Sequence, residues 1–177
     1  MIELELIDTL SAKLEDLFAG YTLLNKSKVL QQVQIFKQYL PQSAGMTIGG
    51  KQGIGGYSDS DYDNNFPCII VRYIDHTDRE ERRIDQSITT IKIVYGIYDE
   101  AAECQGYRDI LNMIEVTRIN LLRERIIGNK FLVNMPLKTR LLDSDTWPVF
   151  YGEMDLVFTT GRPVMGRNYD TKESARE

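Results

Sequence analysis

The glycine-rich segment from Gly45 to Gly56 comes closest to a known chemical motif. Its first eight residues, GMTIGGKQ, nearly match the phosphate-binding loop G-x-x-x-x-G-K-[ST]. In that loop backbone amides hold phosphates, and the terminal hydroxyl binds magnesium. Gln52 stands where the hydroxyl should be, and the glycines continue where a helix N-terminus should supply its dipole. We therefore interpret the segment as a loop without nucleotide chemistry.

Three aspartates in the same region alternate as the first ligands of a calcium loop do, at Asp59, Asp61 and Asp63. The remainder of that motif is absent. Asn64 occupies the place of the sharp-turn glycine, and Ile70 that of the bidentate glutamate. A solvated acidic loop is the favoured interpretation.

The single histidine, His76, and the two cysteines, Cys68 and Cys104, do not form a metal-binding or nucleophilic pattern. His76 has no second histidine with which to share a metal, and it falls in a charged stretch far from any evident serine or cysteine partner. The cysteines are expected to be reduced and partly buried, although the sequence is also compatible with a disulfide between them. We expect no cofactor, no metal and no enzymatic activity.

Composition restricts the partners of the chain. A length of 177 residues suits one domain, and no apolar stretch is long enough for a membrane helix. The start of the chain lacks the features of a secretion signal, so folding in a cytoplasm is expected. The net charge of −5 argues against nonspecific binding to nucleic acid, although an acidic wall would suit a channel through which DNA slides.

Hydrophobic periodicity predicts two helices. Leucines recur at steps of three and four from residue 2 to 18, which is typical of an amphipathic helix that ends near Gly20. A second helical pattern begins at Tyr107, includes Leu111 and Ile114, and closes at Gly128-Asn129. We expect Leu111 and Ile114 to lie on its buried face.

The remaining apolar residues mostly alternate, which predicts strands. The segment from Val33 to Leu40 indicates a short strand, although residues 27–40 could also be helical. Two long antiparallel strands are expected on either side of a charged turn from Asp78 to Arg83, and two more on either side of a turn with Asp143, Asp145 and Pro148.

The order of these elements predicts an α+β fold, a mainly antiparallel sheet with two principal helices packed on one face. We expect one domain over residues 1–161, with a mobile loop rich in glycine and aspartate at 43–65 and a flexible tail at 162–177.

The segment Tyr95–Glu100, followed by Gln105–Glu115, resembles the tail terminator or tail completion proteins of long-tailed bacteriophages and prophages. Further similarities are Phe66-Pro67 with the strand after it, the segment Pro136–Lys138, and an aromatic turn from Trp147 to Met154. The resemblance covers about residues 1–160. The Gly45–Gly56 insertion and the extension after Arg162 depart from it.

The resemblance implies a virion protein that assembles in the host cytoplasm. It would form a ring, commonly of six subunits, that caps the tail tube and ends its polymerisation. Its partners would be other copies of itself, the tail tube protein and the head–tail connector protein, with DNA only passing through the lumen and no membrane contact. Loops at strand ends project toward neighbouring subunits, so we expect the interface residues in the two turns between strands. The candidates are Arg79, Arg82, Arg83, Asp143, Asp145 and Trp147.

Two other interpretations remain. Another neck component, such as a head completion or connector protein, would share the ring symmetry and the place in the virion. A small enzyme or ligand-binding domain would instead use a cleft beside the Gly45–Gly56 loop.

Overall fold

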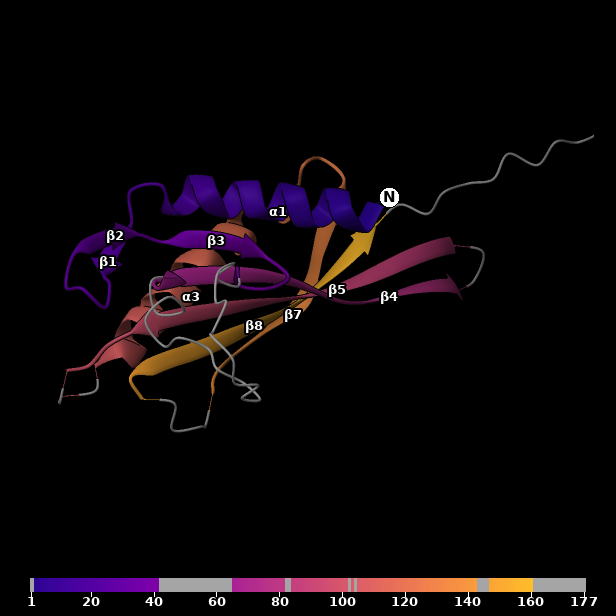
Figure 1. Cartoon of the computed structure of the whole chain (residues 1–177). Helices are drawn as coiled ribbons and strands as arrows, with labels where there is room; N and C mark the ends of the chain where they lie inside the picture. The colour runs from indigo at the N-terminus through magenta and orange to yellow at the C-terminus, as the bar shows by residue number, and fades with distance from the viewer. Residues whose placement is uncertain are drawn as a thin grey trace, which may run out of the picture.

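The computed structural model describes residues 2–41, 65–81, 84–101, 103, 105–142 and 147–160, with only the backbone at 79–81 and 84–86. The phosphate-loop and calcium-loop look-alikes, the loop at 43–64, Cys104 and the tail after Thr160 lie outside these residues. Within them the chain has the predicted α+β fold, a curled and mainly antiparallel sheet with two helices (Figure 1).

Both predicted helices are present. Helix α1 runs from Ile2 to Phe18, with the expected boundaries, and buries Leu6, Leu10 and Leu14 along one side. Helix α3 runs from Gly106 to Arg123. Each has a stripe of apolar side chains at helical spacing, so each is held mainly by the burial of that stripe against the sheet.

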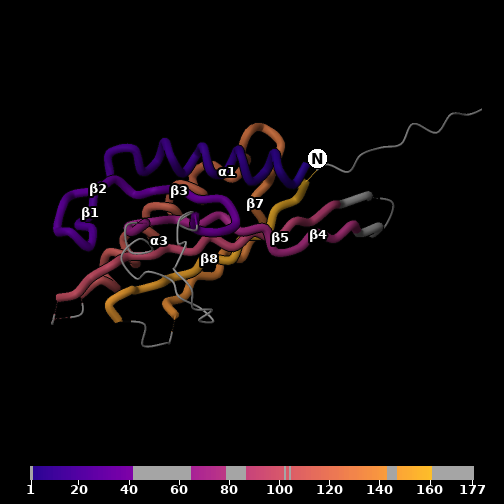
Figure 2. The backbone as a smooth tube through the Cα atoms, viewed as in Figure 1, coloured from indigo at the N-terminus to yellow at the C-terminus, as the bar shows by residue number. Residues whose placement is uncertain are grey.

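The main sheet has six strands in the order β3-β4-β5-β8-β7-β6 (Figures 1 and 2). Only β3 and β4 are parallel, and all other neighbours are antiparallel. A separate antiparallel pair, β1 and β2, follows α1. The strand bounds are β1 Thr22–Leu24, β2 Leu30–Gln32, β3 Gln34–Lys37, β4 Cys68–Glu81, β5 Ile84–Tyr98, β6 Ile126–Ile127, β7 Phe131–Leu141 and β8 Val149–Thr160.

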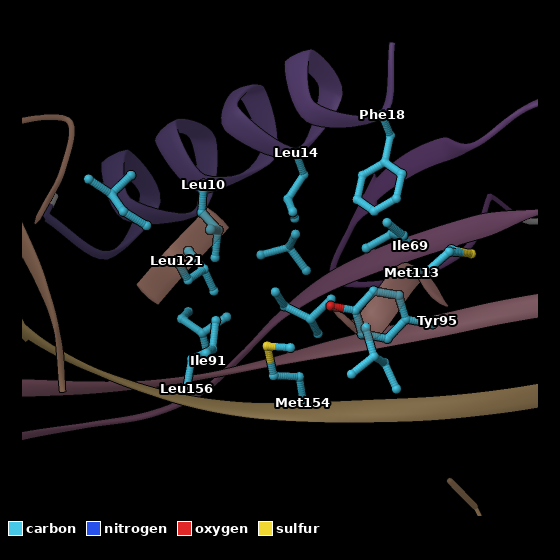
Figure 3. Packing of buried hydrophobic residues seen from close by; sticks show 14 of the residues in the cluster. Leu10, Leu14, Phe18, Ile69, Ile91, Tyr95, Met113, Leu121, Met154 and Leu156 are labelled. Carbon is cyan, nitrogen blue, oxygen red and sulfur yellow. The ribbon is translucent and has the colours of Figure 1, made fainter. Parts of the chain in front are cut away.

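The main core lies between the sheet and the helices. Side chains at alternate positions of β5, such as Ile91 and Tyr95, share one buried cluster with Leu10 of α1 and Met113 of α3 (Figure 3). This arrangement confirms that both helices pack against one face of the sheet. Strand alternation produces this face, because every second side chain of a strand points to the same side.

The opposite side of the sheet, here called the second face, has a smaller apolar cluster. It contains Phe66, Cys68, Ile70, Val94 and Tyr98. Gly96 lies in this cluster, and a Cβ added there would come within 2.6 Å of the Phe66 ring. The chain therefore buries apolar side chains on both faces at this end of β5.

Two expectations for the second helix are wrong. It ends at Arg123, because Ile126 and Ile127 form strand β6 and pair with the start of β7. Gly128 and Asn129, with φ of 57° each, make the turn between these strands instead of ending the helix. Leu111 is 45% exposed, whereas Ile114 is 4% exposed and buried as expected. Met113 and Thr117 complete the buried stripe in place of Leu111.

The charged turn was expected to begin at Asp78, but β4 continues to Glu81 and pairs with β5 as far as Ile84. Polar residues have a low strand propensity, so the sequence of this segment looks like a turn. They can nevertheless form cross-strand pairs in an exposed hairpin.

The short strand expected at 33–40 is confirmed as β3, so the helical alternative for residues 27–40 is wrong.

Candidate functional site

The interface candidates do not form one site. Arg79 lies near the tip of the β4–β5 hairpin, opposite Gln86, whereas Trp147 precedes β8, whose first residue pairs with Tyr98 at the far end of β5. These ends are about 40 Å apart, because an antiparallel strand rises about 3.4 Å per residue. Arg82, Arg83, Asp143 and Asp145 lie outside the described residues.

Trp147 is the candidate whose side chain the structure describes. It is 55% exposed, and the peptide bond between it and Pro148 is cis. The Pro148 carbonyl accepts a hydrogen bond from the Asp99 N–H at 2.8 Å, which ties this turn to the end of β5. An exposed indole on an anchored turn is suited to contact with another protein.

A polar network involving His76 lies at the base of the projecting hairpin. The Nδ1 atom of His76 lies 2.8 Å from Oγ1 of Thr89, and its Nε2 atom lies 3.2 Å from Oδ1 of Asp78. The hydroxyl of Ser87 donates to the same Asp78 oxygen. Glu3 of α1 approaches His76 at 3.9 Å, so the network connects the hairpin to the helix.

This network resembles a hydroxyl–imidazole–carboxylate arrangement, in which the histidine would activate the hydroxyl. Thr89 is 0% exposed and Ser87 is 1% exposed. A nucleophile must reach its substrate, and neither hydroxyl can do so here. We interpret the network as structural. The sequence did not indicate it, because its members come from two strands and a helix.

Four charged side chains meet on the second face where β5, β8 and β7 lie side by side. Nζ of Lys92 lies 3.1 Å from Oε2 of Glu153 and 3.9 Å from Oδ1 of Asp155. Arg140 forms ion pairs with the same two carboxylates. The four charges cancel, so the cluster does not favour an ionic ligand of either sign.

The surroundings of Glu153 lower the pKa of its carboxyl group. Burial opposes ionisation, but hydrogen bonds from Lys92 and Arg140 outweigh it and lower the pKa of Glu153. Its side chain is only 13% exposed. The sequence did not predict this cluster, since the four residues are distributed over three strands.

The segments that carry the family resemblance come together in space. Tyr98 pairs with Val149, and Gly96 pairs with Tyr151. A Cβ added at Gly106, the first residue of α3, would lie 2.6 Å from the Phe150 ring. The Tyr95–Glu115 segment and the Trp147–Met154 turn therefore form one packed corner, although some 30 residues separate them in the sequence.

A carboxylate pair is part of this corner. Partial burial, and then the nearby carboxylate of Asp99, raise the pKa of Asp109. Such a pair could take part in acid–base chemistry. Asp99 accepts a hydrogen bond from the Ala101 N–H at 2.9 Å, which fits a loop-stabilising role.

The outer side of α3 exposes apolar residues between charged ones. Tyr107, Leu111 and Leu122 are each more than one-third exposed. Glu115 and Arg118 form an ion pair on the same side of the helix. Of these three residues, Leu111 is the one that the sequence pattern placed on the buried face of the helix.

Cys68 is confirmed as a buried free thiol. Burial raises its pKa to about 12. Its thiolate is therefore nearly absent near neutral pH, and the residue has the environment of an inert core cysteine.

No sequence profile of a known protein family matches the chain, and no curated protein does so either. Within the described ranges, no group of three or more His, Cys, Asp or Glu side chains could hold a metal ion. The helices in this part of the chain are too short or too polar to span a membrane.

Proposed function

We propose that the chain is a structural protein of a tailed bacteriophage virion, which forms a ring at the end of the tail tube. Six copies would cap the last ring of the tube, stop its polymerisation and present a surface to the head–tail connector protein. This role requires binding surfaces and no catalytic step. The place of action would be the neck end of the tail, with assembly in the host cytoplasm.

The observation that carries this proposal is the resemblance at Tyr95–Glu115. That segment includes the end of β5, the following loop and the first half of α3. It packs against the turn that begins at Trp147, the other most characteristic part of the resemblance. Resemblance in two segments that pack together supports a shared local structure better than resemblance in two unrelated segments would.

The distribution of exposed features is also compatible with assembly. The exposed Trp147 and the hairpin tip lie at opposite ends of the sheet. A ring subunit between a tube and a connector needs contacts on more than one side, because it binds its neighbours and also both adjoining structures.

Deletion of the gene tests the proposal. Without the cap, the tube end keeps the surface that accepts another ring, so tails should have abnormal lengths and should not join to heads. Electron microscopy of lysates would measure both. Normal tails of normal length in the deletion strain would contradict the assignment.

A different neck component is the alternative, and the same experiment separates the two. Loss of a head completion or connector protein should leave tails of normal length that fail to join. Loss of the proposed terminator should also change the length distribution. Complementation with the wild-type chain is the control for either result.

A further inference from the structure

The sheet has two strand edges that are open within the described residues, on opposite sides. On one side, β3 pairs with β4 only as far as Val71, so no described strand pairs with the outer edge of β4 from Ile74 to Glu81, where the Asp78 side chain is bonded to His76 and Ser87. On the other side, β6 pairs with β7 only at Phe131 and Leu132. The far part of β7, Lys138–Leu141, has no outer strand. Open edges present unpaired backbone groups and can accept another strand.

The directions of the strands are suited to pairing between these two edges. Strands β4, β5, β8 and β7 alternate in direction across the sheet. A copy placed beside β7 with the same orientation therefore presents β4 antiparallel to β7. The alternation would continue from one copy to the next without a break. Such a contact is head-to-tail, and rotation can close it into a ring.

The outer edge of β7 has backbone N–H groups that can donate hydrogen bonds to another strand. The N–H of Leu142 donates to the Tyr151 carbonyl of β8. Because successive residues of an antiparallel strand direct their N–H groups to alternate sides, the N–H groups of Leu141 and Thr139 point away from β8. The pairing of β7 with β8 is irregular between Asn134 and Lys138, so the regular part of this edge begins at Lys138.

The charges of the two edges are complementary. Strand β7 carries Lys138 and has no acidic residue, and its Arg140 is already paired with Glu153 and Asp155 of β8. The open part of β4 carries four acidic residues and one arginine, in the sequence IDHTDREE. Opposite charges on two edges favour the mixed pairing over the pairing of either edge with itself.

Antiparallel pairing within these two edges can place Asp75 opposite Arg140 and Thr77 opposite Lys138, so Asp75 and Lys138 are diagonal neighbours across the contact, and the two share a face. Asp75 pairs with Thr90 of β5, and Lys138 pairs with Asp155, the partner of Lys92. Thr90 and Lys92 are two residues apart on β5, so both pairs lie on the second face. Asp75 and Lys138 are exposed there.

We propose that copies of this chain join head-to-tail by antiparallel pairing of the β4 edge at Ile74–Glu81 with the β7 edge at Lys138–Leu141 of the next copy. The two segments lie at different positions along the strand direction. Successive cross-strand partners connect Lys138 to Arg72, which comes before Ile74 on β4. Each copy is therefore displaced along the strand direction relative to the last. Closing a sheet into a barrel requires such a stagger. The inference rests on the proposed ring-forming role for the choice of a second copy as the partner.

A proline substitution tests the backbone pairing. Thr139→Pro removes an outward N–H and leaves the bonds to β8 in place, whereas Thr139→Val keeps the N–H and serves as the matched control. Sedimentation velocity of the full-length chain over a range of concentrations would measure assembly, and circular dichroism would check folding. We expect wild type and Thr139→Val to form closed oligomers, and Thr139→Pro to be folded with at least a tenfold weaker association. A folded Thr139→Pro chain that assembles like wild type, or a monomeric wild type, overturns the proposal.

Charge reversal tests the identity of the two edges. Lys138→Glu and Asp75→Lys should each weaken assembly, and the double variant should recover part of it, because the two side chains are diagonal neighbours across the contact. A two-fold contact of β7 with β7 does not include Asp75, so Asp75→Lys would leave it unchanged and the double variant would behave like Lys138→Glu alone. That result would overturn the head-to-tail arrangement. The two proposals can fail separately. If rings form in solution but the gene deletion leaves tails normal, only the tail-terminating role is contradicted. If the deletion gives abnormal tails but Thr139→Pro assembles normally, only the edge pairing is contradicted.

Discussion

Gly152 of β8 lies directly beneath Ile110 of α3, so closely that a Cβ added to the glycine would be 2.4 Å from Cγ2 of the isoleucine. The helix can pack this near to the sheet because residue 152 has no side chain. Gly152→Ala should therefore force the helix outward and destabilise the fold by about 1–3 kcal/mol. Urea denaturation would measure the change. Gly20→Ala is the matched control, since no atom lies within 4 Å of its added methyl group, and equal stabilities of the two variants would contradict this packing.

Neighbouring apolar residues of α3 should respond differently to truncation. Ile114→Ala leaves a cavity in the main core and should cost about 2–4 kcal/mol of unfolding free energy. Leu111→Ala removes a side chain that is 45% exposed and should cost roughly 0.5 kcal/mol or less in the monomer. Thermal denaturation of both variants below the concentration at which the chain associates is the measurement. Similar losses in both would show that α3 is rotated relative to the arrangement described here.

Acid should weaken the fold in part through Glu153. The pKa of this carboxyl is lower in the folded chain than its ordinary value of 4.5. A lowered folded-state pKa contributes stability above the unfolded value, and that contribution is lost as the pH falls through the folded-state pKa. The difference in unfolding free energy between pH 7 and pH 3 should therefore be smaller in Glu153→Gln than in wild type. Arg140→Met, which removes one of the partner cations, should reduce the same difference, and an unchanged difference in both variants would exclude this role for the cluster.

Arg82 and Arg83, which follow β4 in the sequence, give a test in whole particles. An arginine can pair bidentately with a carboxylate on an adjoining subunit, so reversing both charges to glutamate should lower the joining of heads to tails. The melting temperature of the isolated chain should stay the same, because the expected contact is with another subunit and not within the chain. The paired Arg82→Lys and Arg83→Lys change keeps the charge and is the control. Normal particle yield from the glutamate variant would remove Arg82 and Arg83 from the list of contacts.

Much of the secondary structure could be predicted from residue types alone. The leucines of α1 and the alternating isoleucines of β5 each follow the period of their element, because burial selects apolar residues at every position that faces the core. The buried state of Cys68 was expected for the same kind of reason. The second helix shows the limit of this reasoning. Leu111 and Ile114 fit the same helical period, and only the position of α3 on the sheet decided which of them is buried.

The sequence by itself determined which segments can be helix or strand, and the resemblance at Tyr95–Glu115 supplied the functional hypothesis. The tertiary structure decided what those segments bring together. It extended β4 to Glu81 through cross-strand pairing, placed Arg79 and Trp147 at opposite ends of the sheet, and gathered Lys92, Arg140 and Glu153 from three strands. These relationships depend on register and strand order, which arise from contacts between residues far apart in the chain. Local periodicity reports the side on which a residue is buried, but it does not specify the residue that lies beside it.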